Sequence, residues 1–172
     1  RHERRQLERD LSNYFEKVHM ESNFLPASFL EKGVNRAHSV CRISTPGSFG
    51  SGFMIAGRGY LMTNNHVLPT RDVARDSVAQ FDYDEDDEEY HVELDPDRLF
   101  LTNRELDYTI VALKPHDLPR HIEPIELLRN PATVTREERV NVIQHPQARR
   151  KEVSLHDNKV TYVYDRVIHY SA

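Results

Sequence analysis

The chain has 172 residues and a formal net charge of −5, with 23 basic and 28 acidic side chains spread along it. This length can bury one good core or two small ones, so it fits one domain of two lobes as well as a single unit. The scattered lysines and arginines form no continuous basic stretch of the kind that nucleic-acid phosphates require, so the composition argues against a nucleic-acid-binding protein.

Two helices are expected at the N-terminal end. In residues 1–20, apolar side chains from Leu7 to Val18 recur at a spacing near 3.6, which predicts an amphipathic helix whose apolar stripe needs a partner. The segment SFLEKGVNRAHSV predicts a second helix, with Ser28 as N-cap and Glu31 completing a capping box.

From about Val40 the pattern changes to short runs of strand length. These runs are VCRIST, GSGFMIA, YLMTNNHVL, LDYTIVAL, RVNVIQHP, KEVSL and KVTYVYDRVIHY. Prolines, glycines and the pair Asp157-Asn158 separate the runs, as is typical of antiparallel strands joined by turns. The body of the chain is therefore predicted to be mainly β.

The segment FDYDEDDEEYHVEL, residues 81–94, combines a dense acidic block with flanking apolar residues. It lacks the glycine and the terminal glutamate of an EF-hand calcium loop. We interpret it as a solvated hairpin tip whose charges keep the protein in solution.

The sequence contains ten histidines and one cysteine, Cys41. No two histidines form an HExxH motif, and a lone cysteine cannot build a thiolate site, so we expect neither a metal site nor metal catalysis. We interpret His2, His19 and His121 as surface residues. The single cysteine also excludes an internal disulfide, and no apolar run is long enough for a signal-peptide core or a membrane span, so we expect a cytoplasmic protein without a membrane partner.

Two residues are candidates for chemistry. His66 follows an apolar run and a Thr-Asn-Asn turn, where its side chain can project into a cleft, although a structural role also fits that position. Asp107 begins the apolar run DYTIVAL, and its alternative role is to cap a turn. A buried carboxylate needs a donor, and an imidazole N–H that supplies one leaves the other ring nitrogen free to accept a proton from a hydroxyl.

Three segments resemble the histidine and aspartate blocks of trypsin-like serine peptidases, most closely the bacterial glutamyl-endopeptidase-like branch. They are GSGF at 50–53, TNNHVL at 63–68 and VELDPDRLFLTNRELDYTIVAL at 92–113. The resemblance implies hydrolysis of a protein or peptide substrate by a His-Asp-Ser triad without a cofactor, with His66 as the general base and Asp107 as its orienter.

The resemblance also implies an all-β fold, a chymotrypsin-like double β-barrel with N-terminal helices. We expect residues 1–39 to form a helical extension and residues 40–115 the first β-barrel, which carries the histidine and the aspartate. Residues 116–172 would begin the second barrel, whose final strands are missing from this chain. In the first barrel, Gly50 and Gly52 would let strands and substrate approach closely; a tight turn or a bulge is the alternative.

The family order of histidine, aspartate and serine places the nucleophile after the segment DRVIHYSA. We therefore expect the serine to lie beyond the end of this chain, the remaining C-terminal segment to be a partner fragment, and this chain alone to be inactive. Ser171 has no flanking glycines to supply an oxyanion hole, and Ser51 precedes the histidine, so we expect neither to be the nucleophile.

Two other functions remain open. The chain is an inactive peptidase-like scaffold or binding subunit of a larger bacterial signalling or defence complex, with His66 and Asp107 as relics. Alternatively, it is a regulated component in which the helix from Leu7 to Val18 docks on a partner protein.

Overall fold

The structure is a computed structural model that describes residues 25–84, 89–127, 129, 133–155 and 158–171. The helix predicted for residues 1–20 lies outside the described residues. The chain forms two compact units, Arg1–Leu30 and Glu31–Ala172. Both candidate residues, His66 and Asp107, belong to the second unit. Among the described residues, no helix is long and apolar enough to cross a membrane.

Helix α2, Ser28–Ser39, forms where the second helix was predicted. Ser28 is the first residue of the helix and not its cap. The first backbone N–H groups of the helix donate to carbonyls of the residues that precede it. The Phe29 N–H donates to the Pro26 carbonyl at 2.8 Å and the Leu30 N–H donates to the Ala27 carbonyl at 3.1 Å. The predicted capping box is therefore wrong, whereas the helix itself is confirmed.

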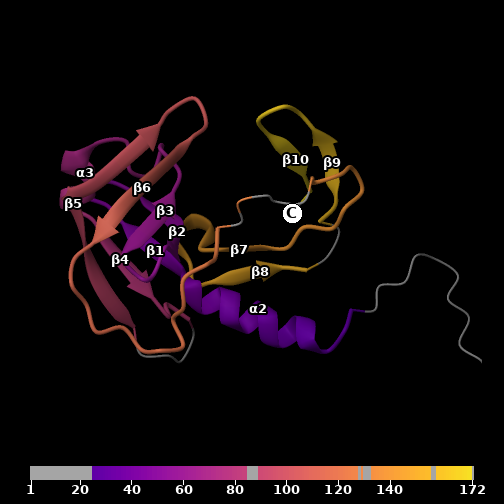
Figure 1. Ribbon diagram of the computed structural model, residues 1–172, viewed down its shortest axis with the longest axis horizontal. Helices are drawn as coiled ribbons and strands as arrows, with labels where there is room; N and C mark the ends of the chain where they lie inside the picture. Colours follow the sequence, from indigo (N-terminus) through magenta and orange to yellow (C-terminus); the bar gives the residue numbers. More distant parts are fainter. Residues whose placement is uncertain (1–24, 85–88, 128, 130–132, 156–157, 172) are drawn as a thin grey trace, which may run out of the picture. The chain divides into compact units, whose positions relative to one another are not determined.

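Six antiparallel strands follow and close into a barrel (Figure 1). They are β1 (Val40–Ser44), β2 (Phe49–Ile55), β3 (Tyr60–Thr63), β4 (Val78–Phe81), β5 (Tyr90–Asn103) and β6 (Tyr108–Leu113), arranged in the order β1-β2-β3-β6-β5-β4. Successive side chains of a strand point to opposite faces, so one face of each strand fills the barrel interior. Ile43, Leu61, Phe81 and Val111 are all fully buried there. The structure confirms the predicted all-β class.

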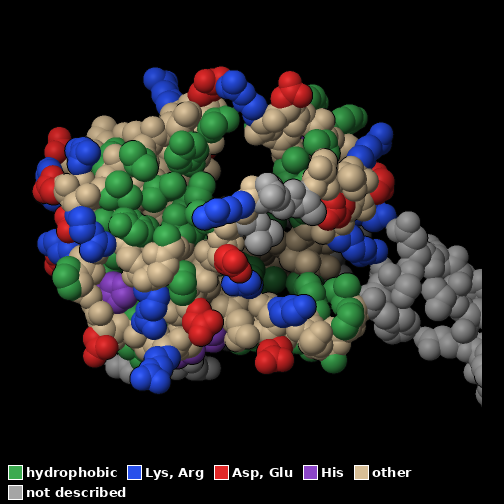
Figure 2. Space-filling view, viewed as in Figure 1, with side chains coloured by type: hydrophobic (Ala, Val, Ile, Leu, Met, Phe, Trp, Pro, Cys, Tyr) green, Lys and Arg blue, Asp and Glu red, His purple; other side chains and the backbone are tan. Residues whose placement is uncertain are grey.

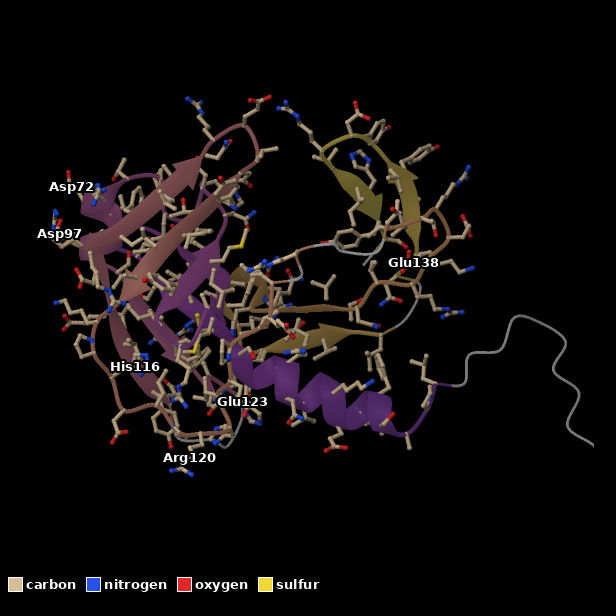
Figure 3. The ribbon with its side chains drawn as sticks, viewed as in Figure 1. Asp72, Asp97, His116, Arg120, Glu123 and Glu138 are labelled. Atoms are coloured by element: carbon tan, nitrogen blue, oxygen red, sulfur yellow. The ribbon has the colours of Figure 1, made fainter. Side chains whose placement is uncertain are left out.

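Strand β5 and the short helix α3 (Arg71–Arg75) did not stand out in the sequence. The pairing of β5 with β6 shifts register between Asp95 and Phe100, and Pro96 and charged residues at this bulge obscure the strand pattern. Helix α3 is tied to the bulge by Arg75, which bonds Asp72 at 2.8 Å and Asp97 at 2.9 Å. Figure 3 shows both carboxylates at that end of the barrel.

The second half of the unit consists of two two-stranded sheets. One pairs β7 (Val142–Gln144) with β8 (Glu152–Ser154), which are joined through the 3₁₀ helix η1 (Pro146–Ala148). The other pairs β9 (Val160–Val163) with β10 (Ile168–Tyr170). The runs RVNVIQHP and KEVSL are therefore confirmed as strands, whereas the single run KVTYVYDRVIHY forms a hairpin of two strands. Together with the closed barrel, these strands fit an incomplete chymotrypsin-like double barrel.

Several hydrogen bonds tie the β7–η1–β8 segment to the barrel, including two from Lys151 to the β4–β5 connection. The His145 backbone N–H donates to the Ser51 hydroxyl at 2.8 Å, and the Arg42 guanidinium donates to the Ala148 carbonyl at 2.8 Å. Arg42 also lies over the Tyr83 ring, 3.5 Å from its centroid, so one half-buried cation joins strand β1, the β4–β5 connection and η1.

The acidic block does connect two antiparallel strands, β4 and β5, as the hairpin prediction requires. The prediction that its charges are simply solvated is wrong for Asp82, which is 2% exposed. Imidazole nitrogens of His38 and His121 bond its two carboxylate oxygens, at 2.9 Å and 2.7 Å. On the face shown in Figure 2, acidic and basic side chains are intermingled.

Candidate active site

His66 lies in the turn that follows strand β3. The Asn64 carbonyl accepts hydrogen bonds from the backbone N–H groups of Val67 and Leu68, at 3.2 Å and 3.3 Å. These bonds fix the backbone around His66, while its side chain is 71% exposed. The turn thus holds the residue and leaves the imidazole free to meet another group.

Asp107 lies in the turn between β5 and β6. Because β3 pairs antiparallel with β6, with Thr63 opposite Thr109, the end of β3 and the start of β6 meet at the same rim of the barrel. Asp107 has φ 48°, a left-handed conformation that aspartate tolerates better than most residues. The barrel therefore brings together two residues that lie 41 positions apart in the sequence.

His66 and Asp107 are joined by two hydrogen bonds. The imidazole Nδ1 lies 2.7 Å from Asp107 Oδ2, and the His66 backbone N–H donates to Oδ1 at 3.0 Å. The Asn64 amide also donates to Oδ2, at 3.2 Å. An ionised carboxylate can only accept, so Nδ1 carries the hydrogen and the Nε2 lone pair is free for a hydroxyl proton.

The prediction that the carboxylate is buried is wrong, because the Asp107 side chain is 43% exposed on its rim turn. Its partial burial raises the pKa of the carboxyl group. The hydrogen bonds from His66 and Asn64 act in the opposite direction and outweigh burial, so the pKa of Asp107 lies below its ordinary value. The group is therefore an anion near neutral pH, as an orienter of an imidazole must be.

A chain of polar contacts supports the histidine turn from the β5–β6 hairpin. The Asn65 amide donates to the Thr102 hydroxyl at 2.7 Å, and that hydroxyl lies 2.7 Å from the Thr109 hydroxyl. Thr109, which is fully buried, donates to the Leu68 carbonyl at 2.9 Å. Sequence reasoning missed these residues, because single threonines in a β-rich chain carry no distinctive signal.

Gly50 and Gly52 are explained by close packing. A Cβ on Gly50 would meet the two γ-carbons of Val67 at 2.5 Å and 2.6 Å, and one on Gly52 would meet the Ile43 side chain at 2.7 Å. Both contacts are shorter than real Cβ contacts permit. The two glycines thus allow other parts of the same protein to approach the strand closely. Gly50 packs directly against Val67, the residue that follows His66.

We expect Gly50→Ala to move the histidine turn. Overpacking of this kind costs roughly 1–3 kcal/mol of stability, and a displacement of about 1 Å at His66 lowers the rate of any reaction that depends on this imidazole by roughly a hundredfold. Chemical denaturation measures the loss of stability, and a peptide-hydrolysis assay of the full-length protein measures the loss of rate. Gly47→Ala is the matched control, because a Cβ there meets nothing within 4 Å. Equal stability and activity of the Gly50→Ala and Gly47→Ala proteins would contradict the explanation. So would a double variant, Gly50→Ala with Val67→Ala, that regains none of the lost stability or activity.

Both serines that were set aside as nucleophiles have structural partners. The Ser51 hydroxyl accepts a hydrogen bond from the His145 N–H at 2.8 Å. The Ser171 hydroxyl accepts one from the Lys159 N–H at 3.3 Å. Neither hydroxyl is brought to the His66 imidazole by a contact among the described residues.

A cavity of about 500 Å³ adjoins the rim beside Asp107. Asn64, Leu106 and Asp107 line it from the barrel, and Ile143 and Tyr170 line it from β7 and β10. Figure 1 shows the β5–β6 and β9–β10 hairpins facing each other across the unit. Arg166 forms an ion pair with Glu105 between their tips. The space beside the carboxylate is therefore bounded by both halves of the unit.

Comparisons with known proteins point to one family. A family model described as "Trypsin-like peptidase domain" matches residues 50–172, more than half of the chain. An uncharacterized protein, y4fB of Sinorhizobium fredii, is 32% identical over 163 residues, which cover 84% of this chain and 24% of that protein. The chain thus spans about a quarter of the length of this relative.

Two solved structures share the fold. The serine endoprotease from Yersinia pestis matches with a TM-score of 0.57 and 19% identity, over 81% of this chain and 46% of that one. An HtrA-type protease, AlgW with a tripeptide, matches with a TM-score of 0.52 and 20% identity, over 77% of this chain and 39% of that one. The arrangement of strands that carries His66 and Asp107 is therefore that of serine proteases.

Proposed function

The chain belongs to the trypsin-like peptidase family, and from this membership we propose that it supplies the general base, His66, and the orienting carboxylate, Asp107, of a serine endopeptidase. The observation that carries the proposal is the 2.7 Å contact between Nδ1 and Oδ2, with the His66 backbone N–H on the other oxygen at 3.0 Å. A carboxylate held by both the ring and the backbone of one histidine fixes its orientation and its tautomer.

In the proposed reaction, His66 Nε2 removes the proton of a serine hydroxyl while the serine oxygen attacks the carbonyl carbon of the scissile peptide bond. The imidazolium that forms is stabilised by Asp107 and then gives its proton to the leaving amine, so the C–N bond breaks and an acyl-enzyme remains. Water hydrolyses this ester with His66 again as base. The reaction needs no cofactor.

We place the nucleophilic serine outside residues 1–172, in a segment that would complete the second barrel. Apolar side chains on β9 and β10 support this proposal, since Tyr162 is 56% exposed and Tyr170 is 44% exposed. Tyr164 and Val167, on the turn between these strands, are each 55% exposed. Further strands would cover this surface, whether they lie on the same polypeptide or on a cleaved fragment.

Three finer assignments belong to the same proposal. The glutamyl-endopeptidase-like branch is favoured by the segments around His66 and Asp107. A bacterial setting is favoured by the relative from Sinorhizobium fredii, and a cytoplasmic one by Cys41, the single cysteine of the sequence, which has no partner for an internal disulfide. A partner protein that docks on the helix expected between Leu7 and Val18 would link the peptidase to a larger complex.

Hydrolysis by the full-length gene product tests the proposal. We expect it to cleave an unfolded protein substrate, and a fluorophosphonate, which phosphonylates activated serines with loss of fluoride, to abolish the cleavage. Residues 1–172 alone should show no cleavage, because they lack the proposed nucleophile. Absence of cleavage by the full-length protein would favour the inactive scaffold, in which the two residues are relics.

A further inference from the structure

A second histidine–aspartate cluster lies apart from the candidate active site. Asp82 accepts hydrogen bonds on both carboxylate oxygens, from His38 Nδ1 at 2.9 Å and from His121 Nε2 at 2.7 Å. The two rings meet edge to face with their centroids 4.5 Å apart. The three residues lie 44 and 39 positions apart in the sequence, so no spacing motif announces them.

The carboxylate at the centre of this cluster is almost fully buried. The Asp82 side chain is 3% exposed, that of His38 is 24% exposed, and that of His121 is 47% exposed. A buried carboxylate is costly unless it is paired with charge or binds a metal ion. Here the groups that face both of its oxygens are imidazoles, which are themselves metal ligands when neutral.

The cluster has the donor set of a transition-metal site. It offers one ligand atom from each of the three residues, and these atoms lie within 4.8 Å of one another. Two imidazole nitrogens and one carboxylate oxygen suit Zn²⁺, whereas Ca²⁺ and Mg²⁺ take oxygen ligands. We propose that His38, Asp82 and His121 bind a zinc ion, with a water molecule as the fourth ligand.

The geometry allows the change from hydrogen bonds to coordination. Zinc holds nitrogen and oxygen ligands at about 2.0–2.2 Å, so the three atoms must close around the ion. His38 is held in helix α2, and Asp82 is held directly after strand β4. The half-exposed His121 ring can therefore move toward the other two ligands to close the site. The hydrogens now shared with the carboxylate must leave the ligating nitrogens, either to the other ring nitrogen or to solvent.

A zinc ion here would act as a clamp. His38 lies in the last turn of α2, Asp82 follows β4, and His121 lies on the connection after β6. Figure 3 shows Arg120 and Glu123, which flank His121, on that connection near the end of α2. The Ser39 hydroxyl already donates to the Glu123 carbonyl at 2.6 Å. The ion would therefore join the end of the helix to two connections of the barrel.

Titration of the metal-free full chain with ZnCl2 in a calorimeter tests the proposal. We expect one zinc ion per chain and a melting temperature that rises with zinc concentration, because a ligand of the folded state stabilises it. His121→Gln should weaken binding at least tenfold, so the same rise in melting temperature should need at least ten times more zinc. Asp82→Asn should do the same, and asparagine tolerates the left-handed backbone that Asp82 adopts at φ 50°.

Two controls separate this site from other histidines. His91→Gln removes an exposed histidine that lies 3.1 Å from Glu89, and zinc binding should be unchanged. His66→Ala should also leave it unchanged. Failure of the native chain to bind zinc overturns the proposal. So does binding that survives in His121→Gln and Asp82→Asn, or binding that only His66→Ala removes, since the ion then lies elsewhere.

Discussion

If the proposed function holds, replacing Asp107 by asparagine is expected to lower kcat of the full-length protein by roughly ten-thousandfold while the barrel stays folded. The reason lies in the two contacts of the carboxylate. The asparagine oxygen can still accept the His66 backbone N–H, as Oδ1 does at 3.0 Å. Its NH2 group then faces Nδ1, which must become an acceptor, so the hydrogen moves to Nε2 and the base is lost.

Steady-state hydrolysis measures this effect, and circular dichroism checks the fold. Asp97→Asn is the matched control, because Asp97 is an exposed carboxylate of the same barrel that bonds Arg75. This control should hydrolyse substrate within a few-fold of the native rate. Near-native hydrolysis by Asp107→Asn would remove the aspartate from the mechanism.

Replacing His66 by alanine should cost even more, roughly a millionfold in kcat, because the members of the proposed triad work as a unit and no other group would take the serine proton. The His66 ring is 71% exposed and packs little, so stability should barely change. Substrate binding should also be retained.

The comparison for this variant is His91→Ala, which removes another exposed ring of the same barrel. His91→Ala should keep native activity. Adding Asp107→Asn to His66→Ala should cause little further loss, because the two residues act through one imidazole. An active His66→Ala protein, or losses that multiply in the double variant, would contradict a shared role.

Much of the barrel was accessible from the sequence, because its strands are short apolar runs between prolines and glycines. Strand β5 was harder to see, since Pro96 and three charged residues interrupt its pattern at the bulge. The cap at Ser28 failed for a local reason, because the carbonyls of Pro26 and Ala27 already take the first free N–H groups of α2. A serine is a poor predictor of a helix cap where nearby backbone carbonyls can accept the same N–H groups as its hydroxyl.

The pairing of His66 with Asp107 was expected from the family resemblance, and the structure explains it by the antiparallel contact of β3 with β6. The exposure of the Asp107 side chain could not be predicted. A sequence pattern does not show how much of a turn at the rim of the barrel is covered by the neighbouring lobe. The cluster around Asp82 was not predicted either. Its acidic block looked solvated, and the two histidines reach it from α2 and from the connection after β6, which only the closed barrel brings together.

The most direct test of the central claim is fluorophosphonate labelling of the full-length protein, read by intact and peptide mass spectrometry. We predict a single adduct on a serine outside residues 1–172, formed rapidly in the native protein and almost not at all in His66→Ala. No adduct, equal labelling of the two proteins, or an adduct on Ser51 or Ser171 would contradict the proposal that His66 and Asp107 activate a serine nucleophile.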